Sequence, residues 1–338
     1  MPEAIHFSLD TPDTLTAFLD RSGWLEPGEQ AKRVSRAGEG NMNFVARVKT
    51  GQRSVIVKQS RPWVEKYPDI SAPEDRILSE VAFYRAIEHE PRLAKGMPRL
   101  LAFDVANRTA LLEDLGDVRD YTSMYDGDRP PCDELRPLLR WLTTLHSAAF
   151  QETLRPDLAN RSMRALNHTH QFALPLASDN GLDLDAVTPG LQAEADRIKQ
   201  NTAYVEAIRA LGDRYLADGE RLLHGDFYPG SWVRTPAGPR VIDPEFAFFG
   251  PAAYDIGICL AHLVMAGYSE SERTVILMGY TPPPRFDRLL AVRFAGMEIM
   301  RRLIGVAQLP MTRTLDQKAD LLVLSEQLVL EPERARLY

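Results

Sequence analysis

The sequence predicts an α+β protein with a small antiparallel β lobe at residues 1–115 and a larger, mainly helical lobe at residues 116–338. Strand-like runs rich in β-branched residues, separated by glycine turns, crowd into the first part. Apolar residues at helical spacing dominate the second part. A chain of 338 residues is also long enough to form two cores. We therefore expect two lobes joined near Glu113.

The first part is predicted to open with a short helix and to continue mainly as strands. Thr11 and Pro12 are typical of a helix start, and Gly23 of a helix end. Another helix is expected to start at Ser71, with Pro73 in its first turn. The glycine turns GEGNMN and KTGQ separate the first three strands. The predicted strands are residues 33–37, 44–48, 54–58, 99–103 and 110–112.

The second part is predicted to contain long helices and one β-hairpin, the only convincing β element there. The hairpin lies in LLHGDFYPGSWVRTPAGPRVIDPEF, at residues 222–246, between Asp226 and Asp243. The chain between these acids is just long enough for a strand, a turn and a returning strand, so we expect both carboxylates at one end. The predicted long helices are residues 135–149, 191–211 and 286–306.

The composition excludes several classes of protein. A net charge of −7 argues against general nucleic-acid binding, which needs a basic face. Cys132 and Cys259 are the only cysteines and lie far apart, so neither a disulfide framework nor a zinc site is predicted. No signal peptide is visible, and the most apolar segment, residues 256–267, is too short to span a bilayer. We expect a cytoplasmic protein without membrane or nucleic-acid partners; its oligomeric state stays open, with a homodimer as one option.

Three motifs resemble one known family. HGDFYPGS at residues 224–231, VIDPEF at 241–246 and YDIG at 254–257 are similar to the aminoglycoside phosphotransferase superfamily, whose fold is protein-kinase-like and bilobal. Within it, DPEFAFFGPAAYDIG most resembles methylthioribose kinases. The resemblance spans residues 33–308 by order of elements and is specific in residues 223–257.

The resemblance implies an ATP- and Mg²⁺-dependent kinase that phosphorylates a hydroxyl of a small molecule, with a sugar such as 5-methylthioribose as the first candidate. An aminoglycoside, choline or another amino-alcohol is the alternative acceptor. A non-catalytic nucleotide-binding relative is a different alternative, but such relatives usually lose an acid or lysine that this chain keeps. Protein kinase activity is disfavoured, because only residues 246–253 are available for an activation segment.

For the nucleotide, phosphoryl transfer needs charge neutralisation and in-line placement of two oxygens. The glycines of GEGNMN have no side chain to block backbone N–H groups from phosphates. Lys58, at the end of the strand VIVK, would hold the α- and β-phosphates, and Glu80 could pair with it. A plain hairpin, a solvated lysine and an exposed glutamate are the alternatives. The resemblance assigns nucleotide binding to Gly38, Gly40, Asn41, Asn43, Lys58, Glu80 and the hinge residues Glu113 and Leu115.

For the chemistry, Asp226 would take the proton of the attacking hydroxyl, a role worth about 10²–10⁴-fold in rate. Asp243 and Glu245 would bind Mg²⁺, a hard cation that prefers oxygen ligands. Ser231 stands where many relatives carry Asn, which implies a weak or water-mediated metal contact. We expect the two flanking polar residues to be structural: His224 bonds the backbone of the turn, and Asp255 braces it.

For the acceptor, the resemblance points to Arg301, Arg302 and Trp63. Adjacent helix residues point about 100° apart, so at most one arginine is expected to aim at the site. An exposed basic turn is the alternative reading. Trp63 belongs to a loop that would flank the sugar. Tyr228 and Trp232 could line a cation-binding cage, with packing in the core as the alternative. His168 and His170 are expected to lie in a loop.

Overall fold

The computed structural model describes residues 5–38, 42–309 and 311–335, and the chain divides into two compact units. The N-terminal unit comprises Met1–Val118, Gln151–Met163 and Ile242–Phe246. The C-terminal unit comprises Arg119–Phe150, Arg164–Val241 and Ala247–Tyr338. The segment containing Asp243 and Glu245 thus belongs to the N-terminal unit, whereas Asp226 belongs to the C-terminal one.

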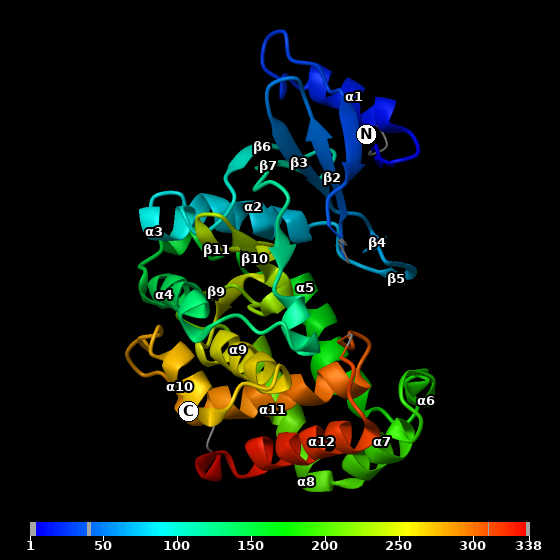
Figure 1. Cartoon of the computed structure of the whole chain (residues 1–338), viewed down its shortest axis with the longest axis vertical. Helices are drawn as coiled ribbons and strands as arrows, with labels where there is room; N and C mark the ends of the chain where they lie inside the picture. The colour runs from blue at the N-terminus through cyan, green and yellow to red at the C-terminus, as the bar shows by residue number, and fades with distance from the viewer. Residues whose placement is uncertain (1–4, 39–41, 310, 336–338) are drawn as a thin grey trace. The chain divides into compact units, whose positions relative to one another are not determined.

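The N-terminal unit is built on a five-stranded sheet in the order β1-β2-β3-β7-β6, in which every neighbouring pair is antiparallel (Figure 1). The small antiparallel β lobe predicted from the sequence is confirmed. The strands are β1 (Arg33–Arg36), β2 (Phe44–Lys49), β3 (Ser54–Gln59), β6 (Leu100–Asp104) and β7 (Thr109–Glu113).

Two helices cover opposite faces of this sheet. Helix α1 (Pro12–Arg21) packs in one cluster with Val57 and Leu111, whereas α2 (Arg76–Ile87) packs against Ala110. Successive side chains of a strand point to opposite faces, so the faces under α1 and α2 differ. The same alternation places Lys58, next to Val57, on the face of the sheet that α2 covers. The ammonium group of Lys58 therefore lies on the α2 side.

The start predicted for helix α2 is wrong. Ser71 ends strand β5 (Tyr67–Ser71), which pairs with β4 (Trp63–Val64), and the backbone N–H of Ala72 donates to Pro62. Because residues up to Ser71 belong to this small hairpin, the helix begins only at Arg76. A short helix, α3 (Pro91–Ala94), follows α2.

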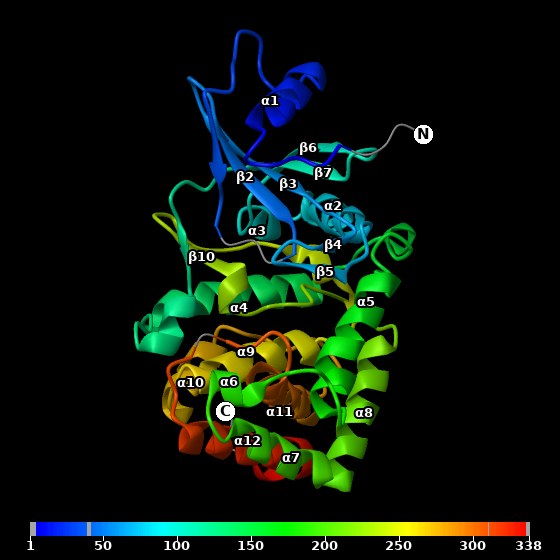
Figure 2. The same cartoon turned by 90° about the vertical axis from the view of Figure 1, so that its right-hand side faces the viewer.

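The C-terminal unit is mainly helical, as predicted, and α11 packs between α9 and α12 (Figure 2). The helix expected at residues 191–211 is two helices, because Asn201 leaves helical conformation and its side chain accepts from Tyr204 N to cap the second one. The helices are α4 (Cys132–Ser147), α6 (Leu184–Val187), α7 (Leu191–Gln200), α8 (Thr202–Leu216), α9 (Ala253–Met265), α10 (Glu270–Leu277), α11 (Arg288–Ile304) and α12 (Leu315–Leu330).

The histidine pair at residues 168 and 170 lies in helical structure, so the loop prediction is wrong. Helix α5 (Arg161–His168) begins in the N-terminal unit and continues in the C-terminal one as a π-helical turn at Thr169–Ala173. The His168 ring stacks on Phe172, four residues later, with ring centroids 5.6 Å apart. Packing of this kind stabilises the turn where polarity alone suggested a loop.

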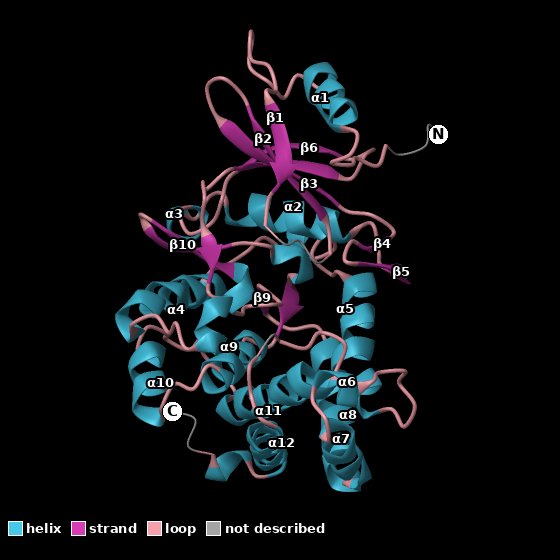
Figure 3. Cartoon of the chain, turned by 45° about the vertical axis from the view of Figure 1, so that its right-hand side comes forward, coloured by secondary structure: helices cyan, strands magenta, loops and turns pink. Residues whose placement is uncertain are grey.

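The C-terminal unit contains more β structure than predicted (Figure 3). Strands β10 (Trp232–Thr235) and β11 (Gly238–Val241) form the expected hairpin, and β8 (Arg119–Asp120) adds to it. However, β9 (Arg221–Leu223) pairs with β12 (Phe248–Gly250) rather than with the returning strand. The turn that carries Asp226 lies between β9 and β10. No helix within the described residues has the length and hydropathy needed to cross a membrane.

Candidate active site

Lys58 lies at the centre of a group of charged side chains in the N-terminal unit. Its Nζ is 2.7 Å from Glu80 Oε2 on α2 and 3.0 Å from Asp243 Oδ1. The side chains of Lys58 and Glu80 are almost completely buried. The ion pair implied by the kinase resemblance therefore forms, and the readings of a solvated lysine and an exposed glutamate are wrong.

The surrounding charges keep Lys58 cationic. Burial by itself would lower the pKa of the Lys58 ammonium, but Asp243, Glu80 and Glu245 outweigh burial and hold that pKa well above its ordinary value. Burial also raises the pKa of Glu80 to about 7, with Lys58 opposing the shift and the carboxylates of Asp243 and Glu245 adding to it. A permanent positive charge at Lys58 is the property that phosphate binding requires.

Asp243 is the accessible acid of this group. Its φ of 60° lies in the left-handed region, which non-glycine residues seldom adopt and which is often found at functional sites. The side chain is half exposed, although Oδ1 is within ion-pair distance of buried Lys58. Its carboxylate can therefore offer oxygen to a cation from outside.

Glu245 is held by a polar network instead. Its Oε2 accepts from Asn43 Nδ2 at 2.8 Å and lies 3.4 Å from Arg76 Nε, which also donates to Asn43 Oδ1. The remaining nitrogens of Arg76 donate to backbone carbonyls of Met42, Arg61 and Pro73. Arg76 is not among the residues predicted from the sequence. Its one signal there is a cation in the first turn of a helix, where the helix dipole disfavours positive charge.

The oxygen donors present fit a hard cation at Asp243 better than at Glu245, which is buried and already paired. In the described part of the chain, no cluster of three or more His, Cys, Asp or Glu side chains is arranged to hold a metal ion. Any Mg²⁺ would therefore need further ligands from phosphate and water. Ser231, in the C-terminal unit, is buried at the end of the 3₁₀ turn Pro229–Ser231.

For several residues that are predicted to bind the nucleotide, the structure gives a position but no contact that tests this role. Gly38 has a φ of 67°, which suits a glycine, whereas Gly40 and Asn41 lie outside the described residues. Glu113 ends β7 and pairs with Arg99 at 3.4 Å, and Leu115 is partly buried just beyond. Their contacts with a nucleotide stay predictions.

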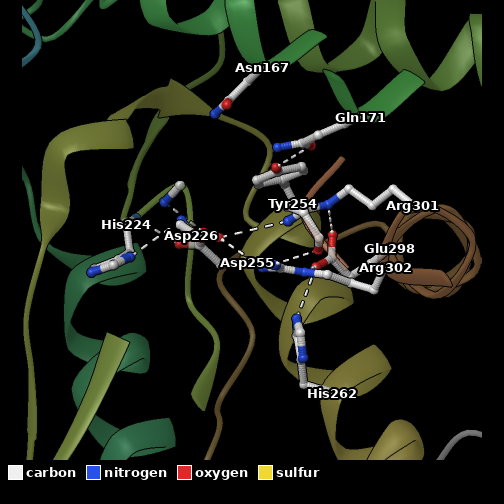
Figure 4. A network of polar contacts seen from close by, with 12 residues as sticks. Asn167, Gln171, His224, Asp226, Tyr254, Asp255, His262, Glu298, Arg301 and Arg302 are labelled. Atoms are coloured by element: carbon white, nitrogen blue, oxygen red, sulfur yellow. Dashed lines mark hydrogen bonds and ion pairs between the residues drawn. The ribbon is translucent and has the colours of Figure 1, made fainter. Parts of the chain in front are cut away.

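Asp226 sits in the C-terminal unit on a turn that Asp255 fixes (Figure 4). Asp255, in the first turn of α9, accepts from the backbone N–H groups of His224 at 2.8 Å and of Gly225 at 2.9 Å. The Asp226 N–H lies 3.3 Å from His224 Nδ1. The bracing role of Asp255 and the backbone contact of His224 are both confirmed.

Two arginines flank the Asp226 carboxylate, contrary to the expectation of at most one. Asp226 Oδ1 lies 3.8 Å from Arg301 Nη2 and 3.7 Å from Arg302 Nη2. Both arginines are buried, so the reading of an exposed basic turn is also wrong. Their Cα–Cβ bonds diverge, but both long side chains bend back to donate from Nε to the carboxylate of Glu298 on the same helix (Figure 4).

Glu298 and His262 form a support that sequence analysis missed. Glu298 is fully buried and also accepts from His262 Nε2 at 2.9 Å, while Tyr125 lies 2.6 Å from His262 Nδ1. Burial lowers the pKa of His262 to about 4. Burial would raise the pKa of Glu298, but Arg301 and Arg302 outweigh it and hold that pKa far below its usual range. The acid is therefore charged and the histidine neutral near pH 7.

The two aromatic residues left open by the sequence have separate uses. The Arg302 guanidinium lies over the Tyr228 ring, 4.6 Å from its centroid, so Tyr228 does contact a cation, but one that belongs to the chain. Trp232 is fully buried, and its ring centroid lies 5.1 Å from that of Phe227. Trp232 is therefore a core residue.

Comparison with known proteins identifies the family of the chain. The family model described as "Phosphotransferase enzyme family" matches residues 33–290. The chain is similar to a methylthioribose kinase of Exiguobacterium sibiricum, at 26% identity over 73% of this chain and 64% of that protein, so it spans less than two thirds of that relative. It is also similar to a methylthioribose kinase of Bacillus cereus, at 25% identity over 80% of this chain and 78% of the relative.

A crystal structure of a spectinomycin phosphotransferase in complex with ADP and spectinomycin has the same fold, with a TM-score of 0.57 and 11% identity over 96% of this chain and 98% of that one. The antiparallel sheet unit, the helical unit and this likeness define a protein-kinase-like fold. The chain belongs to the phosphotransferase enzyme family that the matching model describes.

Proposed function

We propose that this protein transfers the γ-phosphate of ATP to a hydroxyl of a small molecule, with Asp226 as the base. The observation that carries the proposal is the fixed Asp226 turn with two guanidiniums 3.7 and 3.8 Å from the carboxylate. A carboxylate held by backbone hydrogen bonds can orient a hydroxyl and accept its proton. The neighbouring guanidiniums suit the negative charge of a transferring phosphoryl group.

We assign nucleotide binding to residues 1–115 and catalysis with acceptor binding to residues 116–338. In this scheme Lys58, oriented by Glu80, holds the phosphates, and the glycine turn at residues 38–43 supplies backbone N–H groups. Asp243 is the main Mg²⁺ ligand, with Glu245 and Ser231 in lesser or water-mediated roles. Bound Mg²⁺ would neutralise charge on the phosphates. The convergence of Asp226 with Asp243 and Glu245 on one nucleotide stays a prediction.

A sugar such as 5-methylthioribose is the first acceptor to test. The two relatives described above are methylthioribose kinases, which supports this choice. The charges near Asp226 support it too, because Arg301 and Arg302 oppose a cationic acceptor such as choline or an aminoglycoside. Trp63, whose ring meets His6 edge-on at 5.1 Å, stays a candidate for the sugar-flanking side chain.

The cellular setting is proposed from chemistry. Cys132 and Cys259 are free thiols, and ATP is the expected co-substrate, which together fit a cytoplasmic protein. A homodimer remains one option for its assembly.

The variant Asp226→Asn tests the base. It keeps the shape of the side chain but removes the proton acceptor, so we expect kcat to fall at least about 10²-fold with ATP binding retained. ADP release would be measured over methylthioribose, deoxyribose, choline, homoserine and aminoglycosides, and ATP affinity by calorimetry. Asp218→Asn is the matched control, because Asp218 pairs with Arg164 instead. Undiminished turnover by Asp226→Asn would refute the assignment.

A non-catalytic nucleotide-binding protein is the second candidate. The presence of Lys58, Asp226 and Asp243 together argues against it, since degenerate relatives usually lose one of them. ATP binding that is independent of Mg²⁺, with no ADP release for any acceptor of the panel, would favour it.

A further inference from the structure

A chain of three buried side chains leads from the loop after α10 to the Asp226 turn. Tyr280 Oη lies 2.8 Å from His146 Nδ1, and His146 Nε2 lies 3.1 Å from Asp255 Oδ2. The His146 and Asp255 side chains are completely buried. His146 comes from the apolar face of α4, in a run with Leu142 and Leu145. The motifs of the sequence did not single out either Tyr280 or His146.

Hydrogen-bond chemistry fixes the roles along this chain. An ionised carboxylate only accepts hydrogen bonds, so His146 Nε2 carries the hydrogen and its N–H donates a hydrogen bond to Asp255 Oδ2. The hydroxyl of Tyr280 can then donate to Nδ1, which holds the imidazole in that tautomer. Asp255 Oδ2 thus accepts from both His146 Nε2 and the backbone N–H of His224. The carboxylate that fixes the turn is itself oriented from behind.

The same pattern occurs a second time in this unit. Tyr125, His262 and Glu298 form the other Tyr–His–carboxylate chain, and it ends on the two arginines beside Asp226. The hydrogen-bonded series Tyr280–His146–Asp255 therefore supports the backbone that carries Asp226. The other series supports the guanidiniums that face the Asp226 carboxylate. Their parallel placement indicates that buried histidines orient the site from two sides.

We propose that His146, held by Tyr280, is a positioning residue that sets the orientation of Asp255 and, through it, of the Asp226 turn. The proposal rests on the proposed function in that Asp226 is the base. Without the Nε2 donor, the Asp255 carboxylate loses one of the bonds that orient it, and its bonds to the His224 and Gly225 amides weaken. A displacement of about 1 Å at a catalytic group can lower the rate about 10²-fold.

Three variants separate the donor from the space that the ring fills. His146→Leu fills the site without a donor, and we expect kcat to fall about 10²-fold with the KM for ATP unchanged. His146→Gln can place its amide nitrogen near the position of Nε2, and we expect it to recover at least about tenfold of that loss. Tyr280→Phe removes the hydroxyl that fixes the tautomer of His146 but leaves the His146 Nε2 donor in place. We therefore expect kcat to fall about two- to tenfold.

The matched control is Tyr204→Phe, which removes another buried tyrosine hydroxyl bond, 2.7 Å to Ser325, outside this chain of contacts. It should lower thermal stability comparably with Tyr280→Phe and leave kcat unchanged. Far-UV circular dichroism and thermal unfolding would show that each variant is folded.

A second readout is independent of turnover. Hydrogen exchange of peptides covering residues 221–227 should accelerate in His146→Leu and return toward the wild-type rate in His146→Gln. If no acceptor supports turnover, this result alone supports the positioning role while the proposed function fails. The inference is overturned if folded His146→Leu keeps wild-type exchange at this turn, or if His146→Gln and His146→Leu lose kcat equally.

Discussion

Glu298 places one negative charge among two guanidiniums and one imidazole, with no solvent contact. Its position three and four residues before Arg301 and Arg302 lets both side chains return to it along one face of α11. A buried carboxylate is costly unless it is fully paired, so Glu298 depends on the positive charge of its two arginine partners. The residue therefore determines where the two cations beside Asp226 lie.

Glu298→Gln should weaken the ion pairs that hold the side chains of Arg301 and Arg302 in place. The amide keeps the volume but removes the charge that holds the two guanidiniums, and breaking a buried ion pair typically costs about 3–5 kcal/mol of stability. We expect the free energy of unfolding to fall by about this amount and kcat to fall more strongly than the affinity for ATP. Urea unfolding and steady-state kinetics measure the two effects.

Glu326→Gln is the control for this change, because Glu326 pairs with a half-exposed Arg197 at 2.7 Å. Pairs of this kind contribute at most about 1 kcal/mol. Equal effects of the two substitutions would show that Glu298 has no special part in holding the arginines.

At the scale of elements, helices α9 and α11 are in close contact at Gly257. A Cβ built there would lie 2.6 Å from Phe294 Cβ and 2.7 Å from the carbonyl oxygen of Ala291. The glycine of YDIG therefore allows two helix backbones to pack together, and these helices carry Asp255 and the arginine pair respectively. Packing at this crossing links the turn of Asp226 to the guanidiniums that face it.

Gly257→Ala should force the two helices apart. Overpacking of a dense interface costs about 1–3 kcal/mol, which we expect as a loss in the free energy of unfolding by urea. Gly51→Ala is the control, because its Cβ would meet only the flexible end of Lys32, 3.0 Å away at Nζ. An unchanged stability of Gly257→Ala would mean that the helices can separate without loss.

For the whole molecule, buried titratable groups make stability depend on pH. The pKa of His262 is lowered by burial to about 4 from an ordinary 6.5, so the unfolded chain takes up a proton at a higher pH than the folded one. The stability from this group is complete above pH 6.5 and is lost as the pH falls toward 4. The depressed pKa of Glu298 has the same sign and adds a loss below pH 4.5.

The free energy of unfolding should therefore fall by about 3 kcal/mol between pH 6.5 and pH 4 because of His262. Urea unfolding, followed by the fluorescence of Trp141 and Trp232 in the C-terminal unit, measures this dependence. His262→Gln has no titrating ring and should show a flatter profile in this window. A wild-type stability that stays constant from pH 6.5 to pH 4 would contradict the assignment of a neutral buried histidine.

Some secondary-structure elements could be predicted from the sequence, whereas others could not. Alternation of apolar residues along the strands predicted the five-stranded sheet, because a period of two directly reports which side is buried. The start of α2 was misplaced, because pairing of Trp63 with Ser71 used residues that also suit a helix cap. The pairing of β9 with β12 was missed, because a three-residue strand has no period to read.

The sequence by itself determined the family and the two kinds of lobe, and it singled out Lys58 and the acids as candidates, because these features depend on short motifs and on local periodicity. Only the tertiary structure decided that Arg301 and Arg302 both face Asp226, that Arg76 holds Glu245, and that His146 stands behind Asp255. These contacts join residues whose partners lie on other elements or depend on how long side chains bend. Burial then sets their charge states, and burial is a property of the folded chain alone.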